Sequence, residues 1–398
     1  MFQFTSLPPL SLYIHFPWCV QKCPYCDFNS HPLRAELPEE LYIDALLADL
    51  EQDLARVWGR PVRAVFLGGG TPSLFSPAAV DRLLSGVRAR LPLAADAEIT
   101  LEANPGTVEL GRFRGYREAG VNRLSIGIQS FHPEQLRVLG RIHGRDEALA
   151  AAQAARAAGF DNFNLDLMFG LPGQTPEQAL ADVRCALALA PSHLSLYQLT
   201  LEPQTPFHAR PPGNLPDDDA LAIMQESLQR EVASAGFAQY EVSAYARAGY
   251  ECRHNRNYWQ FGDYLGIGAG AHAKITDALG ITRLAKRKQP QDYLAQAGTA
   301  AAIGEERHLS PEDAVFEFML NALRLTQGVP ADLFRDRTGL DYSRLHKPLA
   351  RAGALGFLDT EPGHIRPSLL GRRFLNDLIA LFLPLSQPLP QNSRAGSR

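Results

Sequence analysis

The chain has 398 residues, 45 % of them hydrophobic, and a formal net charge of −4, a length that suits one large domain with a smaller one beside it. The slightly negative charge gives no global electrostatic basis for binding nucleic acid. Five cysteines are too few for a disulfide framework, no apolar run reaches the about eighteen residues that span a bilayer, and the first residues lack the pattern of a secretory signal, so we expect a cytoplasmic protein.

Short apolar runs alternate with amphipathic stretches over the first part of the chain. The apolar runs are rich in Val, Ile, Leu, Tyr and Phe and predict strands over 11–16, 64–69, 98–104, 123–130, 162–170, 193–200 and 239–246. The stretches between them predict helices over 39–58, 77–91, 109–119, 133–139, 146–158, 176–190 and 217–235. Gly120, Gly159 and Gly236 follow three of these helices, as glycine commonly does at a helix end.

This alternation predicts βα units and a parallel sheet. Six or seven units are too few for a closed eight-stranded barrel, so we expect an α/β fold with an incomplete (βα)6 barrel over 8–246, its chemistry at the C-terminal ends of the strands. Residues 247–309, with a glycine-rich part and a basic run, are expected to form a connecting segment. Residues 310–382 predict a small, mainly helical C-terminal domain, and the polar tail 383–398 predicts disorder.

Three of the five cysteines lie close together: Cys19, Cys23 and Cys26 have the spacing C-x3-C-x2-C. Thiolates suit iron–sulfur clusters and zinc. A structural zinc site closes its shell with a fourth Cys or His, and His15 or His31 is the candidate here. Three thiolates on a [4Fe–4S] cluster instead leave one iron free for a small chelating molecule.

The cysteine motif, with Tyr25 before its third cysteine and a predicted strand before its first, resembles that of the radical S-adenosylmethionine superfamily. The resemblance implies that Cys19, Cys23 and Cys26 hold a [4Fe–4S] cluster whose open iron chelates S-adenosylmethionine. In that superfamily, electron transfer from the cluster cleaves the sulfonium and yields a 5′-deoxyadenosyl radical.

Further polar residues follow the later predicted strands. "GGGTP" at 68–72 is a glycine turn that lets the backbone approach a ligand. The carboxylates of Glu102 and Asp166 suit ribose hydroxyls. The amide of Gln129 suits a ribose or a base, and the guanidinium of Arg141 suits a carboxylate. Their surroundings resemble the coproporphyrinogen-oxidase-like branch of the superfamily. The resemblance implies contacts with S-adenosylmethionine from Tyr13, Tyr25, Gly69, Gly70, Thr71, Glu102, Gln129, Arg141 and Asp166, with Thr200 as a looser match.

Two departures separate the chain from the porphyrinogen oxidases of this branch. Their pattern is C-x3-C-x2-C-x-C, whereas Phe28 occupies the position of the fourth cysteine here. They also carry a long segment before the cluster motif, whereas eighteen residues precede Cys19. Both departures favour the haem chaperones of the same branch.

The stretch "CRHNRNYWQFGDYLGIGAGAHA" contains H-N-x-x-Y-W, formed by His254, Asn255, Tyr258 and Trp259. Haem iron needs an axial donor such as His, and a porphyrin face favours flat aromatic side chains. Taken alone, these residues favour packing in a protein core over haem binding. The motif resembles that of the haem chaperones, which implies haem binding at these four positions. Cys252 and His272 are alternative ligands.

We therefore expect a haem chaperone that binds haem, a [4Fe–4S] cluster and S-adenosylmethionine and passes haem to an acceptor protein, for which a respiratory haem protein is one candidate. The alternatives are an oxygen-independent coproporphyrinogen III oxidase and a radical enzyme on another substrate, such as a methyltransferase. Productive cleavage of S-adenosylmethionine, a homodimer and a transient membrane contact through the acceptor stay open. Arg372 and Arg373 face either a propionate or solvent.

Overall fold

The structure is a computed structural model that describes residues 2–106, 110–359 and 361–384. The tail predicted to be disordered lies outside these ranges from residue 385 onward. No helix within them is long and apolar enough to cross a membrane.

Six parallel strands form the centre of the molecule and follow one another in space in chain order. They are largely buried apart from the first four residues of β5, as strands covered on both faces are. They are β1 (Leu10–Phe16), β4 (Val62–Gly69), β5 (Leu93–Ala103), β6 (Arg123–Gln129), β7 (Phe163–Phe169) and β8 (His193–Gln198).

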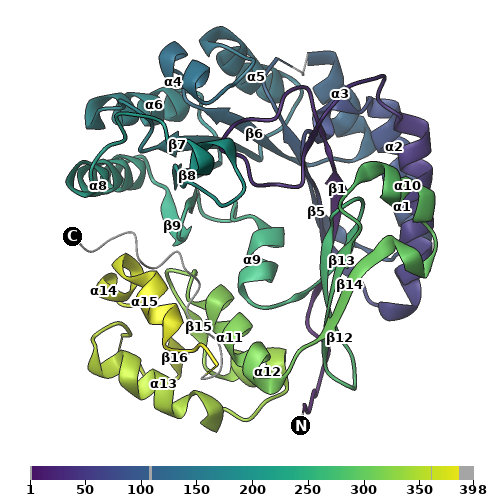
Figure 1. Cartoon of the computed structure of the whole chain (residues 1–398), viewed down its shortest axis with the longest axis vertical. Helices are drawn as coiled ribbons and strands as arrows, with labels where there is room; N and C mark the ends of the chain where they lie inside the picture. The colour runs from purple at the N-terminus through teal and green to yellow at the C-terminus, as the bar shows by residue number, and fades with distance from the viewer. Residues whose placement is uncertain (1, 107–109, 360, 385–398) are drawn as a thin grey trace.

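The connecting helices lie along the outer side of this curved sheet (Figure 1). They are α1 (Glu39–Asp53), α2 (Pro77–Arg90), α3 (Leu110–Ala119), α4 (Pro133–Val138), α5 (Arg145–Ala157), α6 (Pro176–Ala188) and α8 (Asp218–Ser234). Local signals fix their ends: Thr175 and Gln178 form a capping box before α6, and Gly120 and Gly159 have positive φ after α3 and α5. The incomplete (βα)6 barrel and its glycine-ended helices are confirmed.

Residues 239–246, predicted as one strand, form a hairpin. β9 (Ala238–Glu241) pairs antiparallel with β10 (Ala244–Ala246), which pairs antiparallel with β8. The Glu241 carboxylate turns back to accept hydrogen bonds from the backbone N–H of Ser243 at 3.2 Å and from its hydroxyl at 3.1 Å. This local bond stabilises the turn, whereas the alternating pattern alone indicates an unbroken strand.

Residues 247–309 contain four strands that the sequence did not indicate. α9 (Arg253–Trp259) is followed by β11 (Asp263–Ile267), which pairs parallel with β1. An antiparallel meander of β12 (His272–Thr276), β13 (Ile281–Lys286) and β14 (Ile303–His308) then extends the sheet to twelve strands, with α10 (Pro290–Gln296) between the last two. Glycines and buried charged side chains interrupt the apolar pattern that identifies a strand.

The C-terminal part is helical with one two-stranded ribbon, as expected from its helical pattern (Figure 1, light green to yellow). Phe318, Phe334 and Leu345 are fully buried in a second apolar cluster, which also includes Phe261 and Ile281 of the preceding segment. Its elements are α11 (Pro311–Ala322), β15 (Val329–Pro330), α12 (Asp332–Thr338), α13 (Ser343–Ala354), β16 (His364–Ile365), α14 (Leu369–Arg373) and α15 (Leu375–Ala380).

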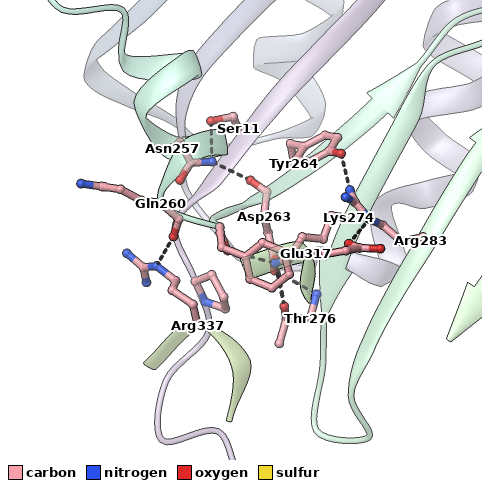
Figure 2. Close-up of polar contacts among 12 residues, drawn as sticks. Ser11, Asn257, Gln260, Asp263, Tyr264, Lys274, Thr276, Arg283, Glu317 and Arg337 are labelled. Carbon is pink, nitrogen blue, oxygen red and sulfur yellow. Dashed lines mark hydrogen bonds and ion pairs between the residues drawn. The ribbon is translucent and has the colours of Figure 1, made fainter. Parts of the chain in front are cut away.

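A buried ion-pair cluster holds β11 to its neighbours (Figure 2). Asp263 is 0 % exposed, and its carboxylate accepts hydrogen bonds from Lys274 Nζ at 2.8 Å, Arg60 Nη2 at 2.8 Å and Thr276 Oγ1 at 2.8 Å. Burial opposes ionisation of Asp263, yet the charges of Lys274 and Arg60 lower its pKa overall. Asp263 is therefore ionised, and each of its carboxylate oxygens accepts hydrogen bonds that offset the cost of burying the charge.

We expect Asp263→Asn to lower the free energy of unfolding by about 3–5 kcal/mol, because it leaves the buried Lys274 ammonium without its counter-charge. Asp96→Asn removes an exposed partner of Arg253 and is expected to leave the free energy of unfolding nearly unchanged, because exposed ion pairs contribute little to stability. Urea unfolding followed by circular dichroism measures both. Equal, small effects would show that the cluster does not stabilise the sheet.

Candidate functional site: two adjoining cavities at the end of the barrel strands

The three clustered cysteines lie in the loop that follows β1. Cys19 ends the short strand β2 (Trp18–Cys19), which pairs with β3 (His31–Pro32), and the backbone N–H of Cys26 donates to the Cys23 carbonyl at 3.2 Å. All three thiols are free and half-buried. The loop therefore presents three sulfur donors from one short segment at the C-terminal end of the barrel.

A cavity of about 400 Å³ opens against this loop. Its walls come from the C-terminal ends of β4 to β8, where a parallel barrel places its chemistry. Among its lining residues are all three cysteines and eight of the nine residues predicted to contact S-adenosylmethionine: Tyr25, Gly69, Gly70, Thr71, Glu102, Gln129, Arg141 and Asp166; the looser match Thr200 also lines it.

The glycine turn after β4 is bonded directly to the cysteine loop. The backbone N–H of Gly70 donates to the Phe16 carbonyl at 2.6 Å, and that of Thr71 to the Trp18 carbonyl at 2.8 Å. A Cβ on Gly70 would lie 2.5 Å from the Trp18 oxygen, so only glycine allows this approach. The Thr71 hydroxyl also lies 3.5 Å from Cys19 Sγ.

Arg141 reaches the cavity from the loop after α4. Its Nη2 donates to Asn104 Oδ1 at 2.6 Å and to the Gly127 carbonyl at 2.7 Å, and its Nη1 lies 3.7 Å from Cys23 Sγ. Its Nε is buried and finds no partner among the described residues. The guanidinium is thus held beside the cysteines, and its Nε–H remains as an unused donor for an anionic group.

Two partly buried carboxyl groups, those of Glu102 and Asp166, share the cavity. Burial, and then the charge of Asp166, raise the pKa of Glu102 to about 8, although Glu102 accepts a hydrogen bond from the Gly69 N–H at 3.0 Å. Burial also raises the pKa of Asp166, against hydrogen bonds from Asn164 and Ser125 at 2.7 and 3.1 Å. Two such groups can bond to the hydroxyls of a ligand.

Gln129 lies at an irregularity of β6, where the register to β7 shifts after Gly127. Its φ of 69° is unusual for a buried non-glycine residue and marks local strain of the kind found at functional sites. Its side-chain oxygen accepts a hydrogen bond from the Tyr197 hydroxyl. Asn104 and Tyr197 line the cavity but were not singled out from the sequence. Their only signal is that Asn104 ends a predicted strand and Tyr197 lies near the end of another.

Both histidines near the cysteines already have hydrogen-bond partners. His15 lies 3.0 Å through Nδ1 from the Tyr13 hydroxyl and 2.8 Å through Nε2 from the Asn29 carbonyl. His31 Nε2 lies 3.2 Å from Asn29 Oδ1. Within the described ranges, no three or more His, Cys, Asp or Glu side chains converge on a single metal ion, whereas a [4Fe–4S] cluster needs only one thiolate for each iron.

A second cavity of about 580 Å³ adjoins the first and shares Cys26, Asp27, Phe28, Gly69 and Glu102 with it. Tyr13, predicted with the first group, lines this second cavity instead, as do His254, Tyr258 and His272. Asn255 and Trp259 are not among its lining residues.

His254 is 8 % exposed and lies on α9 between aromatic rings, 5.0 Å from Phe66 and 6.1 Å from Tyr13 between ring centroids. Burial lowers its pKa to about 4, so the imidazole is neutral at neutral pH. Its Nδ1 is buried and has no hydrogen-bond partner in the described part of the chain. A neutral imidazole without partners retains a lone pair for a metal ion.

Three other residues that the sequence singled out, Trp259, Cys252 and Arg373, lie in different surroundings. Trp259 packs beneath the Arg324 guanidinium, 4.4 Å from its ring centroid. Cys252 is buried with its sulfur 3.6 Å from Glu98 Oε1, and burial raises its pKa to about 12, so it is a neutral thiol. Arg373 pairs with Glu226 on the surface at 2.7 Å.

A buried chain of hydrogen bonds connects the first cavity with α9. Asn164 Nδ2 donates to Asp166, Asn164 Oδ1 lies 2.7 Å from His193 Nδ1, and His193 Nε2 lies 2.8 Å from the Tyr240 hydroxyl. That hydroxyl accepts from the backbone N–H of Cys252 at 3.3 Å, and Cys252 caps α9.

Comparison with known proteins agrees with this geometry. The Radical SAM superfamily is matched over residues 13–186 and the HemN C-terminal domain over residues 309–374. The heme chaperone HemW of Escherichia coli (strain K12) is 53 % identical over 380 residues, 95 % of this chain and 99 % of that protein. The protein of the same name from Haemophilus influenzae is 49 % identical over 383 residues, again 95 % and 99 %.

Among solved structures, coproporphyrinogen III oxidase (HemN) from Escherichia coli, a radical SAM enzyme, matches with a TM-score of 0.80 and 26 % identity over 94 % of this chain and 90 % of that one. The fold is therefore shared with the oxidase, while the sequence is far closer to the chaperones. The chain belongs to the HemW family of the radical SAM superfamily.

Proposed function

We propose that this protein is a haem chaperone, which binds haem at the second cavity and a [4Fe–4S] cluster with S-adenosylmethionine at the first, and passes haem to an acceptor protein in the cytoplasm or at a membrane. The observation that supports it most is His254, a buried neutral imidazole with an unpartnered nitrogen beside a cavity that adjoins the cysteines. The names of the relatives support the same role.

The donor set of the first cavity fits an iron–sulfur cluster. Three thiols from one loop can each bind one iron, which leaves the fourth iron open to a chelating ligand. When bound, the cluster supplies an electron to the sulfonium of S-adenosylmethionine. The residues proposed as its ligands are Cys19, Cys23 and Cys26.

The remaining lining residues fit the parts of S-adenosylmethionine. The spare Nε donor of Arg141 suits a carboxylate, and the Gly69–Thr71 turn exposes backbone groups to an amino group. Glu102, protonated at neutral pH by its raised pKa, can donate a hydrogen bond to a ribose hydroxyl while Asp166 accepts one. Tyr25, Gln129 and Tyr197 contribute the wall for the base.

At the second cavity, His254 supplies the axial nitrogen and Tyr258 an aromatic surface. Tyr13 also lines this cavity. Asn255 and Trp259 would act by shaping α9, because neither lines the cavity.

The second candidate is an oxygen-independent coproporphyrinogen III oxidase, which the TM-score of 0.80 to that enzyme favours. Against it, Phe28 is 58 % exposed and lines both cavities at the position where the oxidase pattern has a cysteine. Reconstituted protein with dithionite and S-adenosylmethionine is expected to release no carbon dioxide from coproporphyrinogen III while binding haem. Sustained release would establish the oxidase instead.

We expect Cys19→Ala, Cys23→Ala and Cys26→Ala each to abolish the broad visible absorbance that follows anaerobic reconstitution with iron and sulfide, because each removes one iron ligand. Cys185→Ala is the matched control, since Cys185 is half-buried on α6 and distant in sequence from the motif. Retained absorbance in all three variants, or its loss in the control, would contradict the cluster assignment.

His254→Ala is expected to weaken haem binding at least about tenfold, or about 1.4 kcal/mol, and to shift the Soret band, because the iron loses its axial nitrogen. His346→Ala, an exposed histidine on α13, should bind haem as the unchanged protein does. Titration by absorbance measures both. An unaltered spectrum and affinity in His254→Ala would exclude this residue as the ligand.

A further inference from the structure

The chain contains only five lysines, against 34 arginines. Lys274 and Lys286 are buried in ion pairs with Asp263 and with Asp49 and Asp53. Lys347 is exposed on α13. The remaining two, Lys22 and Lys288, come from distant parts of the sequence and both line the second cavity.

Both lysines are tied to the same short segment at the edge of this cavity. Lys22 Nζ donates to the Phe28 carbonyl at 3.0 Å. The next residue, Asn29, donates through Nδ2 to the backbone carbonyls of Lys288 and Ala269, each at 2.9 Å. The two lysines therefore lie on the same part of the rim, although one precedes most of the barrel in the sequence and the other follows it.

Neither ammonium group pairs with a carboxylate of the described residues, whereas the two buried lysines do. The cavity contains two acidic side chains, Asp27 and Glu102. Glu102 is held protonated at neutral pH by a pKa raised to about 8 through burial. One carboxylate thus faces two ammonium groups, and the rim favours an anion.

The interior of the cavity is aromatic. Tyr13, Tyr258 and Tyr264 line it together with His254, and the rings of Tyr258 and Tyr264 lie 4.9 Å apart between centroids. Flat aromatic surfaces favour a flat apolar ligand. A planar ligand that fits both the aromatic interior and the positively charged rim therefore carries its negative groups along one edge.

We propose that Lys22 and Lys288 bind the carboxylate groups of a planar dicarboxylate tetrapyrrole and thereby select tetrapyrroles with free carboxylates and fix their orientation, with the ring against the tyrosines and its metal toward His254. This inference rests on the proposed haem binding and adds to it the residues that determine specificity. A carboxylate forms a stronger, charge-assisted hydrogen bond with an ammonium group than with a neutral donor.

The test compares two probes that differ only in charge, ferric protoporphyrin IX and its dimethyl ester, delivered in the same detergent and titrated by absorbance. The unchanged protein is expected to bind the diacid about tenfold more tightly than the ester. The double variant K22Q/K288Q should reduce this preference to within about twofold while its ester affinity stays the same. K22R/K288R should restore the preference, and K347Q, which changes the exposed fifth lysine, should leave it intact.

The outcomes separate the two proposals. His254→Ala is expected to weaken both probes alike and to keep the preference for the diacid. If the double variant keeps the full preference, the lysine inference is overturned while haem binding stands. If the unchanged protein binds neither probe, haem binding itself fails, and the inference fails with it.

Discussion

The parallel pairing of β1 on both of its edges is the constraint on which the rest of the structure depends. β1 aligns Phe16 with Gly69 of β4 on one side and Ile14 with Ile267 of β11 on the other. Parallel strands in register end at the same edge of a sheet. The cysteine loop, the glycine turn and the segment after β11 are therefore brought together by backbone pairing, before any side chain of the two cavities is considered.

The hydrogen bonds of the site follow from that alignment. The backbone N–H groups of Gly70 and Thr71 reach the carbonyls of Phe16 and Trp18, and Asn29 reaches the carbonyl of Ala269. The loop with the thiols is thus held from both neighbours by backbone partners. Its shape is independent of the groups proposed to bind there, as a preorganised site requires.

Much of the barrel could be predicted from the sequence because its signals are local. Apolar runs, Pro176 at the first turn of α6 and Gly159 after α5 each act within a few residues. The strands of 247–309 could not be predicted, because their buried charges, such as Asp263 and Lys274, are compensated by partners distant in sequence. Lys274 in a buried strand resembles a surface residue until its carboxylate partner is known.

Some residues of the two cavities could likewise be predicted from the sequence, and others could not. The cysteines and Gly69–Thr71 could be predicted because their spacing is part of the motif. Tyr13 lies at the second cavity, and Asn104 and Tyr197 at the first, because side-chain direction is set by pairing across strands. The hydrogen-bonded chain from Asp166 through His193 and Tyr240 to Cys252 likewise joins four segments of the chain, and no single segment contains a signal for it.

The bonds from Asn29 to Ala269 and Lys288 span 240 and 259 residues. A ribosome makes the cysteine loop first and its supports much later, and domains generally fold as units during synthesis. β11 cannot add to the free edge of β1 until Ile267 has left the exit tunnel. Until then, the thiols belong to a loop supported on one side only. The mature loop is therefore a late product of translation, because two of its supports, β11 and the backbone of Lys288, are made long after the cysteines.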